Sequence, residues 1–114
     1  MTDRLTSALL VNALMRRAQA AGGQMTVLRK GDPVSGTILL QAVERGEERG
    51  LFERVPDYAR GGYQMMAVGP AIDADPLTRM DYIERRRSSD PDLWVVELDI
   101  AEAERFAAVT ICST

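Results

Sequence analysis

Residues 37–43, Thr-Ile-Leu-Leu-Gln-Ala-Val, are the stretch that decides the fold. Successive side chains of an extended chain point to opposite sides, so Ile38 and Leu40 share one face while Leu39 points to the other. Apolar residues on both faces are typical of a strand that lies inside a sheet. We therefore predict a central strand at these residues.

Four further strands are predicted from short runs that are apolar or alternate in polarity, at residues 25–30, 51–55, 63–68 and 93–98. The segments 31–36 and 44–50 between them are rich in glycine and polar residues, which is typical of turns. Connections this short cannot join parallel neighbours, so we expect the first four strands to form an antiparallel meander. The adjacent Met65 and Met66 then point to opposite faces of the fourth strand.

Two amphipathic helices complete the pattern. In residues 5–21 the apolar side chains fall on one arc at 100° per residue, with Thr2 or Asp3 as the N-cap and Gly22-Gly23 as the stop. The second helix begins at Asp75-Pro76, an N-cap followed by proline at the first helical position, and runs to about Arg87. We expect the core-facing side chains of this helix to include Leu77, Met80 and Ile83.

The order of these elements is α-β-β-β-β-α-β, which defines the fold class as α+β. We expect a largely antiparallel five-stranded sheet with two helices packed mainly on one face, so that the other face is left to solvent or a partner. A length of 114 residues fits a single domain, 1–114. We expect one further helical turn at Ala101 to Phe106. We cannot assign a regular element beyond it and expect a loosely ordered C-terminal tail from about residue 107.

Charge and cysteine content narrow the classes of function. The net charge of -3 disfavours general binding to nucleic acid or to anionic membranes, both of which require a positive field. A single cysteine, Cys112, fits a reducing compartment, and no apolar run approaches the length of a membrane span. We therefore expect a cytoplasmic protein without a membrane partner.

Three segments resemble a family of small uncharacterised bacterial proteins, classed as a domain of unknown function. They are Arg4-Leu5 with Leu10-Val11 and the stretch Leu14 to Gly22, then Val27 to Asp32, and most distinctively Asp90-Pro91-Asp92-Leu93-Trp94-Val95-Val96-Glu97. The resemblance spans the chain up to about Asp99, and the last fifteen residues depart from it. It implies a stand-alone bacterial domain and carries no activity.

Catalytic chemistry has few candidates in this chain. Because there is no histidine, the usual general base and the commonest metal ligand are both missing. Cys112 lacks a histidine partner, and neither glycine pair lies in a strand–loop–helix that could bind phosphate. We expect no catalytic residue, no cofactor and no metal, and we do not expect an enzyme.

Five arginines form the first candidate site. If the two helices pack side by side, Arg16 and Arg17 could merge with Arg85, Arg86 and Arg87 into a patch that binds an anion or the RNA backbone. The alternative is that these arginines lie on solvated helix ends, where the helix dipole favours cations.

Asp90, Asp92, Trp94 and Glu97 form the second candidate site. Three carboxylates beside an aromatic ring could hold a cationic ligand or a hard metal. In the structural alternative Asp90 ends a helix, Asp92 caps a turn and Trp94 anchors the core.

The leading functional hypothesis is a small, non-catalytic binding or protein-interaction module. It would form a homo-oligomer, such as a dimer, or bind another protein, through the second sheet face or an exposed edge strand. The anion or RNA site and the pocket near Asp90 to Glu97 remain its alternatives.

Overall fold

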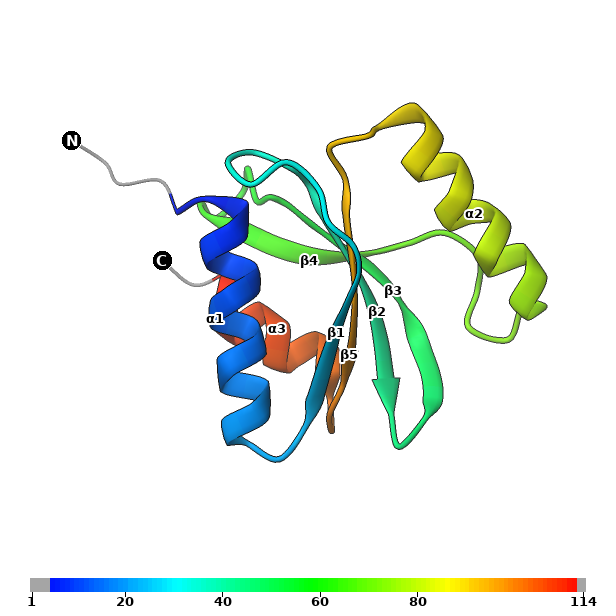
Figure 1. Ribbon diagram of the computed structural model, residues 1–114, viewed down its shortest axis with the longest axis horizontal. Helices are drawn as coiled ribbons and strands as arrows, with labels where there is room; N and C mark the ends of the chain where they lie inside the picture. The colour runs from blue at the N-terminus through cyan, green and yellow to red at the C-terminus, as the bar shows by residue number, and fades with distance from the viewer. Residues whose placement is uncertain (1–4, 113–114) are drawn as a thin grey trace.

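Eight elements follow one another along the part of the chain that the computed structural model describes, residues 5–112. Figure 1 shows them in colour order from the N-terminus. They are α1 (Ser7–Ala20), β1 (Gln24–Arg29), β2 (Ile38–Glu44), β3 (Glu47–Pro56), β4 (Tyr63–Val68), α2 (Pro76–Ser89), β5 (Trp94–Asp99) and α3 (Ala103–Ile111).

The five strands form one mixed sheet with the order β1-β5-β2-β3-β4. β2 pairs with β5 in parallel, and the other three pairings are antiparallel. The predictions of a largely antiparallel sheet and of a central strand at 37–43 are confirmed. The meander is confirmed only for β2, β3 and β4, because β5 lies between β1 and β2.

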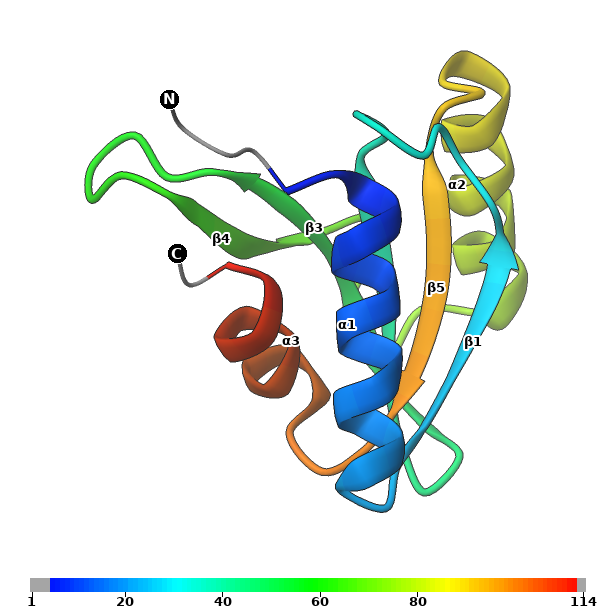
Figure 2. The same ribbon diagram turned by 60° about the vertical axis from the view of Figure 1, so that its left-hand side comes forward.

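The helices lie on both faces of the sheet, which corrects the prediction of two helices on one face. α1 and α3 pack on one side, while α2 lies on the other (Figures 1 and 2). The physical reason is that Leu39 and Val95 are buried on the second side, where Ile83 of α2 packs against them. The second face of the sheet is therefore not the bare association surface that we expected.

A third helix, α3, begins in the segment where one helical turn is expected and extends into the region expected to be a tail. Ala103, Ala107 and Ile111 are spaced by four residues, so they share one face of the helix, and all three are buried. The stretch from residue 107 to Ile111 is thus helical and belongs to the core. This helix and α1 cover the same side of the sheet.

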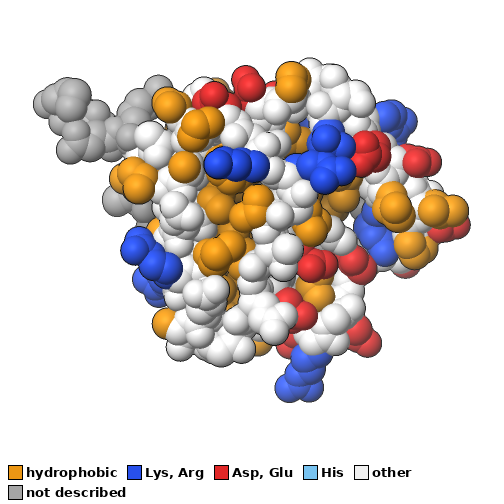
Figure 3. All heavy atoms as spheres, in the orientation of Figure 1, with side chains coloured by type: hydrophobic (Ala, Val, Ile, Leu, Met, Phe, Trp, Pro, Cys, Tyr) orange, Lys and Arg blue, Asp and Glu red, His pale blue; other side chains and the backbone are white. Residues whose placement is uncertain are grey.

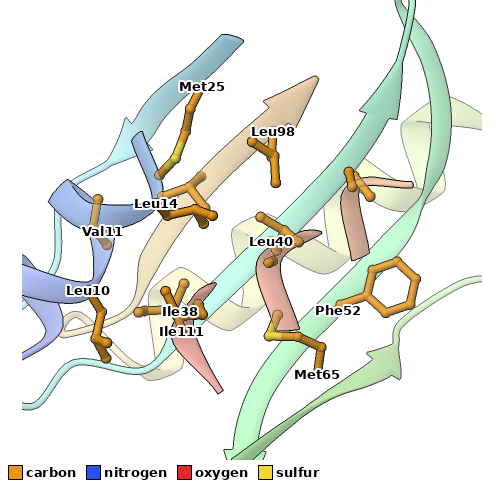
Figure 4. Packing of buried hydrophobic residues seen from close by; sticks show 14 of the residues in the cluster. Leu10, Val11, Leu14, Met25, Ile38, Leu40, Phe52, Met65, Leu98 and Ile111 are labelled. Atoms are coloured by element: carbon orange, nitrogen blue, oxygen red, sulfur yellow. The ribbon is translucent and has the colours of Figure 1, made fainter. Parts of the chain in front are cut away.

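The larger of two apolar clusters lies between the sheet, α1 and α3 (Figure 4). Leu14 of α1, Leu40 of β2 and Ile111 of α3 meet there, and each is almost fully buried. The smaller cluster, on the α2 side, consists of Leu39, Leu93 and Val95, with Val68 and Ile83 packed against it. Most of the apolar burial therefore occurs on the α1 and α3 side.

Element ends differ from the sequence predictions by a few residues. The N-cap of α1 is Thr6, whose side-chain oxygen accepts a hydrogen bond from Leu9 N; the predicted caps Thr2 and Asp3 lie outside the described residues. Asp75 and Pro76 begin α2 as predicted. β3 begins at Glu47, so the loop predicted at 44–50 is instead a tight turn between β2 and β3. Arg45 and Gly46 have positive φ in this turn.

The loop between β1 and β2 packs closely against the start of β5. A Cβ atom on Gly31 or Gly36 would collide with the Asp92 carbonyl oxygen, so glycine is required for this contact. Trp94 Nε1 donates a hydrogen bond to the Asp32 carbonyl oxygen at 2.7 Å. The backbone N–H of Ser35 hydrogen-bonds the Asp32 carboxylate and holds its pKa below the usual value.

Replacing Ile111 tests whether α3 belongs to the core. We expect Ile111→Ala to lower the free energy of unfolding by about 2–5 kcal/mol, because it removes a buried side chain and leaves a cavity. Val109→Ala is the matched control on the exposed side of the same helix, with an expected change within about 0.5 kcal/mol. Urea denaturation measures both, and equal effects would contradict the buried position of Ile111.

Candidate functional site

The five candidate arginines lie on two helices that the sheet separates. Arg16 and Arg17 belong to α1, whereas Arg85, Arg86 and Arg87 belong to α2 on the opposite face (Figure 1). The structure therefore does not join them into one patch. Two of them are already paired with carboxylates: Arg86 with Glu53 at 2.8 Å and Arg87 with Glu84 at 3.1 Å.

The second set of candidates is also divided between the two faces. Trp94 is only 4% exposed and packs in the larger cluster, on the α1 and α3 side. Glu97, three residues further along β5, points to the α2 side because strand side chains alternate. Trp94 is thus a core anchor, as the structural alternative holds, and its ring is no platform for a ligand.

Asp90 and Asp92 have local roles. Asp90 is the C-cap residue of α2, and its carboxylate accepts a hydrogen bond from Asp92 N at 3.1 Å. Within residues 5–112 no group of three or more His, Cys, Asp or Glu side chains is arranged to hold a metal ion. In the same residues no helix is both long and apolar enough to cross a membrane.

α2 is oriented differently from the sequence prediction. Leu77 and Met80 are 65% and 60% exposed, so the expectation that they face the core is wrong; Arg79 is buried instead, at 8%. Ile83 does pack toward the sheet, and Tyr82 is half-buried. The reason is electrostatic, because two glutamates of β3 lie beneath the helix and pair with its arginines.

The first of these pairs joins Arg79 to Glu48, with Nε and Oε1 3.8 Å apart. Arg79 Nη1 also donates hydrogen bonds to the carbonyl oxygens of Ile72 and Ala74, at 3.2 and 2.9 Å. Gln41 Nε2 donates to Glu48 Oε2 at 2.7 Å, whereas Glu48 Oε1 is buried without a hydrogen-bond partner in the described part of the chain. Burying Glu48 Oε1 without a hydrogen bond costs free energy, because the oxygen loses its hydration.

The second pair joins Arg86 to Glu53, and Arg86 also donates to the Tyr82 hydroxyl at 3.0 Å. Burial acts to lower the pKa of Arg86, but the hydrogen bonds to Glu53 and Tyr82 outweigh it and raise that pKa above its usual value. Gly69 lies against the Tyr82 ring, where a Cβ atom would be crowded. α2 is therefore attached by two ion pairs and a small apolar contact.

On the other face, β3 and β4 are linked to the end of α3 through Arg54. Its Nε donates to the Ile111 carbonyl oxygen at 2.7 Å, and its guanidinium lies 3.7 Å from the centroid of the Tyr63 ring. Burial lowers the pKa of Arg54 and raises that of the neighbouring Cys112 thiol. Cys112 is thus mostly a neutral thiol at neutral pH, which is unsuited to nucleophilic chemistry.

The two edges of the sheet differ in their protection. β1 has a register irregularity between Val27 and Arg29 and carries a charge, both of which discourage further pairing. β4, with the sequence Tyr-Gln-Met-Met-Ala-Val, carries no charge and pairs with β3 without a register shift. A groove of about 420 Å³ lies beside it, lined by β4 and by α3 residues that include Ala108 and Val109.

The hydrogen-bonding groups of this edge can be placed from the β3–β4 register. Asp57 N donates to Gly62 O at 2.9 Å, and bonded pairs alternate along an antiparallel ladder. The N–H groups of Tyr63, Met65 and Ala67 therefore point away from β3. Within residues 5–112 they make no backbone hydrogen bond outside the sheet pairing. Sequence reasoning identified β4 as a strand but could not show that it lies at the edge.

These features define a small α+β domain with a mixed five-stranded sheet, helices on both faces and one open edge. The chain belongs to the family described as Protein of unknown function (DUF1491), whose model matches residues 5–108. The resemblance inferred from sequence is confirmed, and it extends beyond Asp99 into α3.

Solved structures of similar proteins include three from two bacteria. The chain is 33% identical to a DUF1491 family protein from Caulobacter crescentus CB15, in a crystal structure with a TM-score of 0.77 that covers 95% of this chain and 98% of that one. An NMR structure of a DUF1491 family protein from the same organism gives 34% identity, 92% and 94% coverage, and a TM-score of 0.72. The solution structure of Atu0922 from A. tumefaciens is 30% identical in sequence, with a TM-score of 0.65, and the match covers 86% of this chain and 87% of that one. No curated protein matches the chain.

Removing one glutamate from β3 tests how α2 is attached. We expect Glu53→Ala to lower the free energy of unfolding by about 1–3 kcal/mol, because it leaves the half-buried Arg86 without its carboxylate. In the matched control, Glu84→Ala removes the exposed partner of Arg87 and should cost less than about 0.5 kcal/mol. Thermal and urea unfolding measure the difference, and equal losses would refute an attachment through Glu53.

Proposed function

We propose that this domain is a non-catalytic, cytoplasmic protein-interaction module that self-associates through the edge of β4. The single observation that carries the proposal is the open edge itself, an uncharged six-residue strand without a bulge. Natural proteins block such edges with charges, bulges or covering segments, because an unblocked edge pairs with another strand. The opposite edge, β1, has these protections.

The β4 strand of a second copy is the occupant that this edge fits. An antiparallel pair related by a two-fold axis and centred on Met65 places Tyr63 opposite Ala67 of the second copy, and Ala67 opposite its Tyr63. These are the residues whose N–H groups point outward, so each opposed pair can exchange two hydrogen bonds. The same pairing covers Met66, which is 46% exposed, with Gln64 of the second copy. Closed two-fold dimers are the commonest oligomers.

A proline at position 67 tests the proposal. Size-exclusion chromatography with light scattering should give twice the chain mass of 12.6 kDa for the wild type. Ala67→Pro removes one outward N–H group and none that bonds to β3, so we expect it to give the monomer mass with an unchanged circular dichroism spectrum. A wild-type monomer at high micromolar concentration, or a dimer that survives Ala67→Pro, would refute association through β4.

A pair of lysine substitutions separates the edge from general surface hydrophobicity. Met66→Lys places a charge on β4 and should give the monomer mass. Met80→Lys places the same charge at a similarly exposed methionine of α2 and should keep the dimer mass. Dissociation by Met80→Lys alone would assign the contact to α2 and contradict the proposal.

A further inference from the structure

An exposed apolar cluster lies on the outer side of α2, separate from the β4 edge. We call it the α2 patch, and it consists of Leu77 and Met80 of the helix, both exposed. Figure 3 shows hydrophobic side chains gathered at this end of the molecule, with acidic side chains beside them. The patch is a different surface from the β4 edge, because α2 lies over the face of the sheet and is paired with β3, whereas the outward N–H groups of β4 lie along the margin of the sheet.

The orientation of α2 is the first argument that this cluster has a partner. Folding of one chain would gain more from burying Leu77 and Met80 than from burying Arg79. The helix nevertheless turns Arg79 inward, onto a glutamate whose Oε1 has no hydrogen-bond partner within residues 5–112. The ion pairs of Arg79 and Arg86 with the β3 glutamates set this orientation, and they leave Leu77 and Met80 without cover in the monomer. An apolar cluster with a polar surround is typical of a binding site.

The charges around the patch indicate the chemistry of that partner. Asp81 and Glu84 are exposed, and they come four residues after Leu77 and Met80, so they lie beside the patch on the helix surface. Asp73 is exposed in the loop before the helix. The basic side chains Arg85 and Arg87 come only at the C-terminal end of the helix, and Arg87 is paired with Glu84. The surround of the patch is therefore mostly acidic, which repels nucleic acid and anionic membranes and attracts a basic segment.

We propose that the α2 patch docks a basic amphipathic helix of another protein. Leu77 and Met80 are three residues apart, so they form a ridge on α2. This ridge can pack into the groove between apolar side chains spaced three and four residues apart on a second helix. Lysine or arginine beside those side chains would face Asp81 and Glu84. A second copy of this chain fits less well, because a contact of the patch with itself would oppose these carboxylates.

The experiment measures binding of two labelled synthetic helices by fluorescence anisotropy. One is an 18-residue peptide with leucines on one face and lysine and arginine on either side of them; the other has glutamate in place of every basic residue. We expect only the basic peptide to bind, more weakly as salt rises. The double variant Leu77→Ser, Met80→Ser should weaken binding at least about ten-fold, since central apolar contacts dominate such interfaces.

Controls remove equally exposed side chains elsewhere. Val34→Ser, Val109→Ser should change the affinity less than about two-fold, because neither valine belongs to the patch. Asp81→Lys should weaken the binding of the basic peptide and allow the acidic peptide to bind. The proposal is overturned if the basic peptide does not bind at about 100 μM, if the Leu77, Met80 double variant binds it as the wild type does, or if that variant lowers the oligomer mass. A lower oligomer mass of the Leu77, Met80 double variant would mean that the patch binds a second copy of this chain. If the wild type is instead a monomer, the proposed β4 pairing fails, but binding of the basic peptide is still expected.

Discussion

The parallel pair of β2 and β5 places apolar side chains on both sides of one sheet, and the position of every helix follows from the need to cover them. Leu39 and Leu40 are neighbours in sequence, point to opposite faces and are both fully buried. α1 and α3 cover the Leu40 side with a large apolar cluster. The Leu39 side has a much smaller cluster and a single helix, so the two faces are closed by different means.

This asymmetry explains why α2 is unusual. With little apolar surface beneath it, the helix is held by the pairs Arg79–Glu48 and Arg86–Glu53, and it turns its arginines inward. The consequence is an amphipathic helix whose leucine and methionine face outward. β4 lies at the margin of the sheet, where α3 packs against its inner face. Within residues 5–112 no strand pairs with the outer backbone groups of β4.

Local pattern predicted much of the fold. Alternating or apolar runs predicted all five strands, and the Asp75-Pro76 pair correctly predicted the start of α2. Only the first part of α3 was predicted, as one helical turn at Ala101 to Phe106, because the helix is short and follows a residue in the left-handed conformation, Glu102, without a capping side chain. Its spacing of Ala103, Ala107 and Ile111 was a readable signal.

Which face a helix covers depends on contacts between distant residues, and local pattern does not contain them. Leu77 and Met80 read as core positions because apolar periodicity is the same whether a helix faces the sheet or a partner. Only the placement of Glu48 and Glu53 beneath α2 explains the reversal. The candidate arginines, and likewise Trp94 and Glu97, do not form the predicted sites because they lie on opposite faces of the sheet. Which face a residue lies on cannot be decided before the topology is known.

Amide hydrogen exchange at β4 tests self-association most directly. We expect the N–H groups of Tyr63, Met65 and Ala67 to exchange slowly in concentrated protein and quickly after dilution, because a second copy protects them only in the dimer. The N–H groups of Gln64, Met66 and Val68, which bond to β3, should be protected at both concentrations. Rapid exchange of the N–H groups of Tyr63, Met65 and Ala67 at every concentration would rule out pairing through β4.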